Sequence, residues 1–123
     1  MPFPLTEKQL RQATPELIRL LDQFVLRFIK LQDTLGTHVL RQFAVRILAE
    51  PVEDSPFIDV LNLLERRGYL MADQWALQRS TRNILTHEYP DDPLRRAQAL
   101  SAARVAARQL TGWLRRIQER TKV

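Results

Sequence analysis

Apolar residues recur every three or four positions through most of the chain, and no stretch alternates apolar and polar residues for long enough to indicate a strand. This spacing places apolar side chains along one face of an α-helix. The longest runs occupy residues 15–33 and residues 93–123. The pattern predicts an all-α fold, an antiparallel bundle of four to five helices in a single domain that spans residues 1–123.

The first long helix has a clear predicted start. Thr14 before Pro15 combines a side-chain cap with a proline at the first helical position, and the helix is predicted to run to about Asp33. Its apolar face is broad, so more than one neighbour is expected to pack on it, in the core or at a dimer interface. Gly36 then interrupts the pattern before a second periodic segment that ends near Glu50.

Three further helices are predicted from proline, glycine and capping residues. A surface loop at residues 51–56 contains two prolines and precedes a short helix that ends at Gly68, because glycine favours the position just after a helix. Asp73 is predicted to cap the next helix, and Pro90 to limit its end. The last helix starts at Pro93, and its many alanines suggest close helix packing.

The composition limits the classes of chemistry. The chain of 123 residues has no cysteine and two histidines, which excludes thiol catalysis and disulfides and argues against a zinc site made by this protein alone. No cofactor or metal is therefore expected. The N-terminus lacks a signal peptide pattern and no apolar run is long enough for a membrane span, so we expect a cytoplasmic protein without membrane contact.

The net charge of +5 is concentrated near the C-terminus. Residues 91–123 hold eight Lys and Arg against three Asp and Glu, whereas residues 1–90 are balanced. A basic element on a neutral body suits a polyanion, since neutralising phosphates releases counterions, and it suits an acidic protein partner equally well. On an ideal helix Arg104, Arg108, Arg115 and Lys122 lie within about 40° of one another, beside the apolar face, where they are well placed to border a cleft. A solvated helix face whose cations favour the helix dipole is the alternative.

The segment from Arg82 to Tyr89 joins a cation, an amide, an imidazole and a phenol more closely than any other part of the chain. Imidazole moves protons near neutral pH, and guanidinium binds phosphate through paired hydrogen bonds, so Arg82 and His87 suffice for phosphodiester cleavage without a metal. Asn83 is predicted to orient the phosphate or the imidazole. An ordinary polar helix face is the competing interpretation.

A helical projection predicts which side of this helix meets solvent. Arg82 and His87 are separated by about 140° but both fall on the polar side, so both are predicted to point outward. Bringing them together requires local unwinding near Pro90 or the same residues of a second subunit. The predicted core side holds Leu77, Thr81, Ile84 and Leu85.

The segment contains an Arg-x4-His-x-Tyr motif, formed by Arg82, His87 and Tyr89. In this motif the chain resembles the HepT-like toxins of the HEPN superfamily. The polar Asn83 after the arginine also fits. The likeness covers most of the chain as architecture, a small helical bundle with the motif late in its penultimate long helix, but its specific residues occupy only positions 82–89.

The resemblance implies a HEPN-like fold and the toxin of a type II toxin-antitoxin system, acting as a metal-independent endoribonuclease on RNA. It implies a homodimer in which two Arg/His motifs line one cleft. It also implies a nucleotidyltransferase antitoxin of the MntA type that attaches adenylate to Tyr89. Under this hypothesis Arg82, Asn83 and His87 form the catalytic set. Arg79, Arg104, Arg108 and Arg115 are predicted to bind RNA.

Other interpretations remain open at this stage. A non-catalytic module that docks a nucleotidyltransferase, or serves as its substrate-binding subunit, is predicted by the same fold and apolar faces. A DNA-binding helical domain is a third alternative, without a helix-turn-helix pattern to support it. Asp33 either pairs with an arginine of the motif or is an ordinary helix-end carboxylate. Trp75 and Trp113 are predicted to be core or interface anchors.

Overall fold

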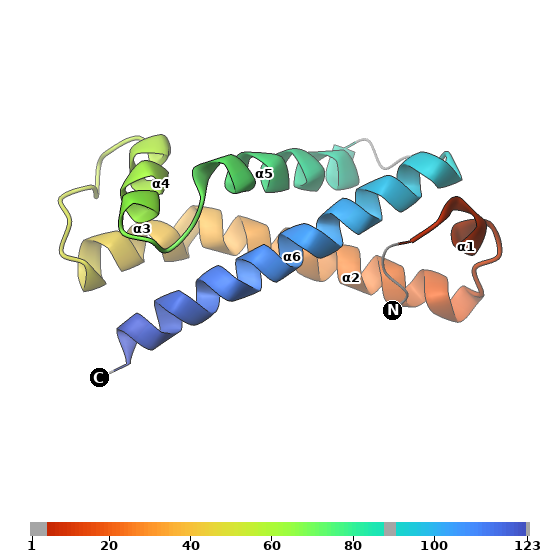
Figure 1. The fold of residues 1–123 in the computed structure, drawn as a ribbon, viewed down its shortest axis with the longest axis horizontal. Coiled ribbons are helices and arrows are strands. Elements are labelled where there is room, and N and C mark those ends of the chain that lie inside the picture. The colour runs from red at the N-terminus through yellow and green to blue at the C-terminus, as the bar shows by residue number, and fades with distance from the viewer. Residues whose placement is uncertain (1–4, 88–90, 123) are drawn as a thin grey trace.

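The computed structural model describes residues 5–87 and 91–122, and within these ranges all regular secondary structure is helical. The predicted all-α bundle is confirmed. Figure 1 shows α5 (Ala72–His87) running back along α2 (Pro15–Thr34), with α6 (Pro93–Thr121) crossing α2 at an angle. The short α4 (Phe57–Arg66) covers the end of the bundle where α5 begins.

The helix that starts at α2 does not stop at Gly36. Leu35, Leu40 and Phe43, which join the successive segments, all have right-handed helical backbone angles. The predicted interruption is therefore wrong, and the second periodic segment belongs to the same rod. Beyond Thr34 the rod consists of η1 (Leu35–Val39), α3 (Leu40–Gln42) and η2 (Phe43–Ile47), in which two π-helical turns flank one α-helical turn.

Gly36 has a packing role instead of a chain-breaking one. A Cβ atom at this position would lie 3.0 Å from Cζ2 of Trp75, closer than side-chain carbons normally approach. The missing side chain therefore lets the indole of α5 lie against the rod. The rod ends at Ile47, a few residues before the predicted end near Glu50, and Ala49 then adopts a left-handed conformation with φ of 56°.

Most predicted boundaries agree with the structure. The Thr14 hydroxyl accepts a hydrogen bond from the Leu17 amide at 3.1 Å, and the Asp92 carboxylate caps α6. Gly68 follows α4 with φ of 84°, as expected for a glycine that closes a helix. The predicted end of α5 near Pro90 lies outside the described residues.

Two features near helix starts differ from the prediction. Asp73 lies in the first turn of α5 and does not cap it; the Ala72 amide instead donates to the Glu65 carboxylate at 2.9 Å. A short helix, α1 (Glu7–Arg11), was not predicted. It begins with a reciprocal capping box between Thr6 and Gln9, so the sequence does carry a signal for it.

The core is one cluster to which every long helix contributes. Trp75 and Trp113 are both buried, with ring centroids 6.5 Å apart, which confirms them as core anchors. Among the described residues, no helix combines the length and the apolar character that a bilayer crossing requires. The buried residues of α6 are Ala97, Leu100, Ala103, Ala106, Leu110, Trp113 and Ile117.

Candidate functional site

The motif helix α5 turns to the bundle a side that only partly matches the predicted one. Leu85 is buried as predicted, together with Trp75, but Leu77, also expected in the core, is 70% exposed, and Gln78 is buried. Arg82 follows Gln78 by four residues and therefore lies on this inner side, with its side chain only 16% exposed. The expectation that Arg82 projects into solvent is wrong, because α5 packs against both α2 and α6 through this side.

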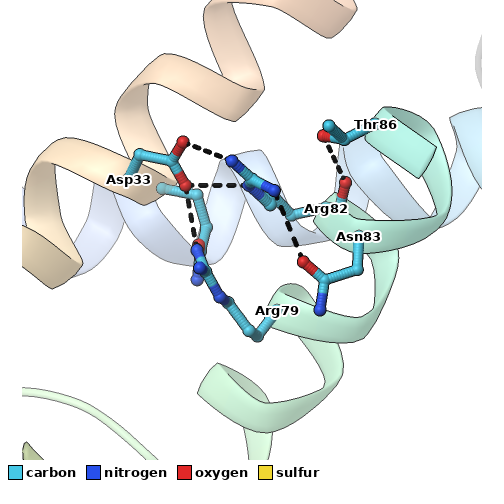
Figure 2. A network of polar contacts seen from close by, with 6 residues as sticks. Asp33, Arg79, Arg82, Asn83 and Thr86 are labelled. Atoms are coloured by element: carbon cyan, nitrogen blue, oxygen red, sulfur yellow. Dashed lines mark hydrogen bonds and ion pairs between the residues drawn. The ribbon is translucent and has the colours of Figure 1, made fainter.

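Arg82 is held by Asp33, which lies near the end of α2. Its Nε donates to Oδ1 of Asp33 at 2.8 Å and its Nη2 donates to Oδ2 at 2.6 Å, a bidentate geometry visible in Figure 2. Hydrogen bonding from Arg82 holds the pKa of Asp33 below its ordinary value, and the same bond raises the pKa of Arg82. Asp33 therefore pairs with the motif arginine, as one of the two interpretations had it.

Arg79 is the second cation on this carboxylate. Its Nη1 donates to Oδ1 of Asp33 and to Oε1 of Gln32, both at 2.9 Å. Two guanidinium groups thus share one carboxylate, which leaves an excess of one positive charge in the cluster. Such a cluster attracts an anion at its exposed edge. The prediction that Arg79 binds RNA is not tested by this contact.

One nitrogen of Arg82 remains outside the ion pair. Nη1 makes a long contact of 3.5 Å to Oδ1 of Asn83, a side chain that is itself exposed. This contact is weak at that length. The side of the guanidinium that faces Asn83 is therefore the one from which Arg82 can bind a further acceptor.

His87 is exposed and lies at the edge of a groove between α4 and α5. Arg79 lines this groove, and it also lines a neighbouring groove that contains Asp33 and Arg82. Within one chain, then, His87 and Arg82 line adjacent grooves, and neither groove contains both residues. The remaining residues of the His87 groove are Ile58, Leu61, Ala72, Trp75, Ala76, Ser80, Asn83 and Ile84.

Tyr89, the predicted modification site, lies outside the described residues. The three arginines of α6 lie elsewhere, and they do come together: Arg104, Arg108 and Arg115 line one groove beside α2. The projection from sequence thus placed them correctly at the border of a groove. Their proposed role in binding RNA stays a prediction.

Two buried glutamines behind the cluster were not singled out from the sequence. Gln32 and Gln78 are almost fully buried, and Gln78 donates to Gln109 of α6 at 2.9 Å. The sequence signal was present, because Gln32 follows Phe28 by four residues and Gln78 follows Trp75 by three, so both occupy positions of an apolar face. Gln32 also accepts a hydrogen bond from Arg79, so it joins the Asp33 cluster to the core.

Among the described residues, no group of three or more His, Asp or Glu side chains is arranged to hold a metal ion. The chain was compared with family models, curated proteins and solved structures, and none of them matches it.

Proposed function

We propose that this protein is a HepT-like toxin of the HEPN superfamily, a metal-independent endoribonuclease. The motif Arg82-x4-His87-x-Tyr89 supports the proposal from the sequence. The observation that carries it is the bidentate pairing of Arg82 with Asp33, which fixes the guanidinium while its Nη1 faces Asn83. A catalytic cation is most effective when it is held in place before the reaction begins.

The proposed reaction uses the 2′-OH of RNA as nucleophile. His87 accepts the 2′-OH proton, the 2′ oxygen forms a bond to phosphorus, and the bond from phosphorus to the 5′ oxygen breaks. A second acid protonates the leaving 5′ oxygen. Arg82 stabilises the negative charge that grows on the phosphoryl oxygens, and Asn83 orients the phosphate.

In this proposal a second copy of the chain completes the catalytic site. In one chain Arg82 and His87 face adjacent grooves, so one protomer alone does not gather the catalytic set. The groove beside His87 has apolar walls, and Ile58 on its border is 56% exposed. Apolar surface around a polar centre suits self-association. Dimerisation across this groove would bring two His87 side chains together, one as base and one as acid.

The regulatory part of the proposal follows from the resemblance. A nucleotidyltransferase antitoxin of the MntA type would transfer adenylate to Tyr89, two residues after His87. The modification would add bulk and a phosphate charge where an RNA phosphate has to bind. Adenylylated protein is thus expected to lose RNA cleavage.

The test compares the chain's two histidines. Wild-type protein, His87→Ala and His38→Ala are incubated with labelled RNA in the presence of EDTA. His38 is exposed on η1 and makes a matched control. We expect His87→Ala to lose cleavage and His38→Ala to retain it. Cleavage by His87→Ala at the wild-type rate would refute the proposal.

The second candidate function is a non-catalytic module that binds a nucleotidyltransferase or its substrate. One observation favours it: Arg82 is 16% exposed, and Asp33 already occupies its Nε and Nη2. The two functions differ in the cell. Growth inhibition that disappears in Arg82→Ala or His87→Ala favours catalysis, whereas growth inhibition that persists, or is absent from the start, favours binding.

A further inference from the structure

A groove of about 640 Å³ lies between α2 and α6, separate from the grooves around Arg82 and His87. Phe24 of α2 contributes an aromatic ring to it, and α6 contributes three guanidinium groups. Among the described residues that line this groove there is no acidic side chain. The residues of α6 in the groove are Arg104, Ala107, Arg108, Thr111, Gly112 and Arg115.

The three arginines form a row along the helix. With a rise of 1.5 Å per residue, Arg104 and Arg108 are about 6 Å apart along the axis, and Arg115 lies about 10 Å farther on. The side chains of Arg108 and Arg115 are exposed, and neither side chain makes a hydrogen bond or ion pair with any residue that the structure describes. The groove therefore presents a line of positive charge to solvent, in the segment that carries the excess charge of the whole chain.

We propose that this groove binds single-stranded RNA at a second site, away from the cleavage site. The phosphates lie along Arg108 and Arg115, and one base stacks on Phe24. A row of cations beside an aromatic ring is the combination by which proteins bind unpaired nucleic acid. The inference rests on the proposed function in one respect only, namely that the ligand is RNA.

The aromatic ring of Phe24 in the groove favours single-stranded RNA over double-stranded RNA. A base stacks on a side chain only when it is free of its own neighbours, as in loops and single strands, whereas a duplex offers mainly phosphate and ribose. Phe24 is half-buried between the two helices, so only an inserted group reaches it. Phe24 and Arg104 each have an interaction within the protein, so the phosphate contacts are assigned chiefly to Arg108 and Arg115.

The test measures binding with a probe that the protein cannot cut. A short fluorescent oligouridylate with 2′-O-methyl groups lacks the nucleophile, so its anisotropy reports affinity alone. Arg108→Glu is compared with Arg120→Glu, an equal charge change on the same helix about 120° away around its axis. We expect Arg108→Glu to weaken binding at least tenfold and to reduce the salt slope by about 0.7 for each phosphate that the variant no longer neutralises. Arg120→Glu should change affinity less than about threefold, as screened long-range charge does.

Phe24→Leu tests the stacking directly. It keeps an apolar side chain of similar burial, and we expect it to weaken single-strand binding by about fivefold or more while leaving the affinity for a duplex of the same length unchanged. Circular dichroism of each variant establishes that the helices are retained. Equal weakening by Arg108→Glu and Arg120→Glu, or unchanged single-strand affinity in Phe24→Leu, would overturn the inference.

The outcome is separable from that of the cleavage test. The cleavage test depends on His87, whereas the affinity test depends on Arg108 and Phe24, so failure of this inference does not remove the proposed function. Conversely, cleavage that is independent of His87 removes the proposed function, and the affinity series with the uncleavable probe still decides whether the groove binds RNA. A groove that serves an acidic protein partner would show unchanged RNA affinity in both Arg108→Glu and Phe24→Leu.

Discussion

Asp33 is the residue on which the geometry of the motif depends, because it accepts two hydrogen bonds from Arg82. In Asp33→Asn the guanidinium keeps its place beside the core but loses its charged partner. We expect the free energy of unfolding to fall by about 1–2 kcal/mol, the range for hydrogen bonds to charged groups at a partly exposed site. Urea unfolding measures this, with Asp22→Asn on the exposed side of α2 as the control, for which no comparable loss is expected.

Cleavage by the same variant distinguishes positioning from folding. Under the proposed function, Asp33→Asn lowers the rate because Arg82 is no longer fixed, even at temperatures where the variant is fully folded. Replacement by Glu, which restores the charge at a different length, should recover stability better than activity. Wild-type activity in folded Asp33→Asn would show that the ion pair has only a structural role.

The pH dependence of stability follows from the direction of the Asp33 pKa shift. Hydrogen bonding from Arg82 lowers the pKa of Asp33 below 3.8 in the folded state, so the ionised carboxylate stabilises the protein above the unfolded-state pKa of about 4. That contribution is lost as the pH falls through the folded-state pKa. We expect the stability difference between wild type and Asp33→Asn to be constant from pH 5 to 7 and to shrink below about pH 4. A difference independent of pH down to 2 would contradict this assignment.

At this scale the sequence identified the motif residues but could not orient them. A projection of α5 takes Leu77 for a core residue because leucine is apolar, whereas in the structure Leu77 is exposed and Arg82 is turned inward. The reason lies outside α5: Asp33, 49 residues away in the chain, provides the charged partner that makes the inner position favourable for Arg82. No local pattern within α5 contains that information.

The close contact between α5 and the rod at Gly36 gives a second prediction about stability. Alanine normally stabilises a helix by about 0.5–1 kcal/mol relative to glycine, and Gly112 on α6 has open space where the Cβ would lie. We therefore expect Gly112→Ala to raise the free energy of unfolding by that amount. At Gly36 the same change places a methyl group 3.0 Å from Trp75, and we expect a loss of about 1 kcal/mol or more.

The paired comparison isolates packing from propensity, since both glycines lie in helices and receive the same substitution. Denaturant midpoints of the two variants should move in opposite directions. Stabilisation by both would mean that the indole of Trp75 moves aside without cost, and the close approach of α5 to the rod would then not limit this position.

Among the elements, those with local signals were predictable. Thr14 with Pro15 and Asp92 with Pro93 mark helix starts through contacts within four residues, and the structure has both. The continuation of the rod past Gly36 was not predictable in the same way, because glycine there serves the approach of α5 and not the end of a helix. The missed α1 had a capping-box signal but too few residues to show a helical period.

At the scale of the whole molecule, the motif residues and the arginine row of α6 line different grooves. The Asp33 cluster and the His87 groove adjoin through Arg79, while the arginine row of α6 borders another groove with Phe24. Under the proposed function an RNA strand is held at one place and cut at another. Arg82 and His87 line different grooves of one chain, so under the proposed function a second copy completes the cutting site.

The border of the His87 groove is accordingly expected to be an interface between two copies. Ile58→Glu places a charge on an apolar position that is 56% exposed, and burying that charge in a dimer would be strongly unfavourable. We expect sedimentation velocity to show a dimer for wild type and a monomer for Ile58→Glu. Cleavage of RNA should fall together with the dimer, because each half-site then lacks the partner's His87.

Leu26→Glu is the matched control for this prediction. Leu26 is 68% exposed on α2, and among the described residues it lines none of the grooves around the motif. The same apolar-to-acidic change there should leave both the dimer and the cleavage rate intact. A wild-type protein that is monomeric and still cleaves RNA in a His87-dependent manner would contradict the requirement for a second copy, and one chain would then have to bring Arg82 and His87 together by a rearrangement of α5.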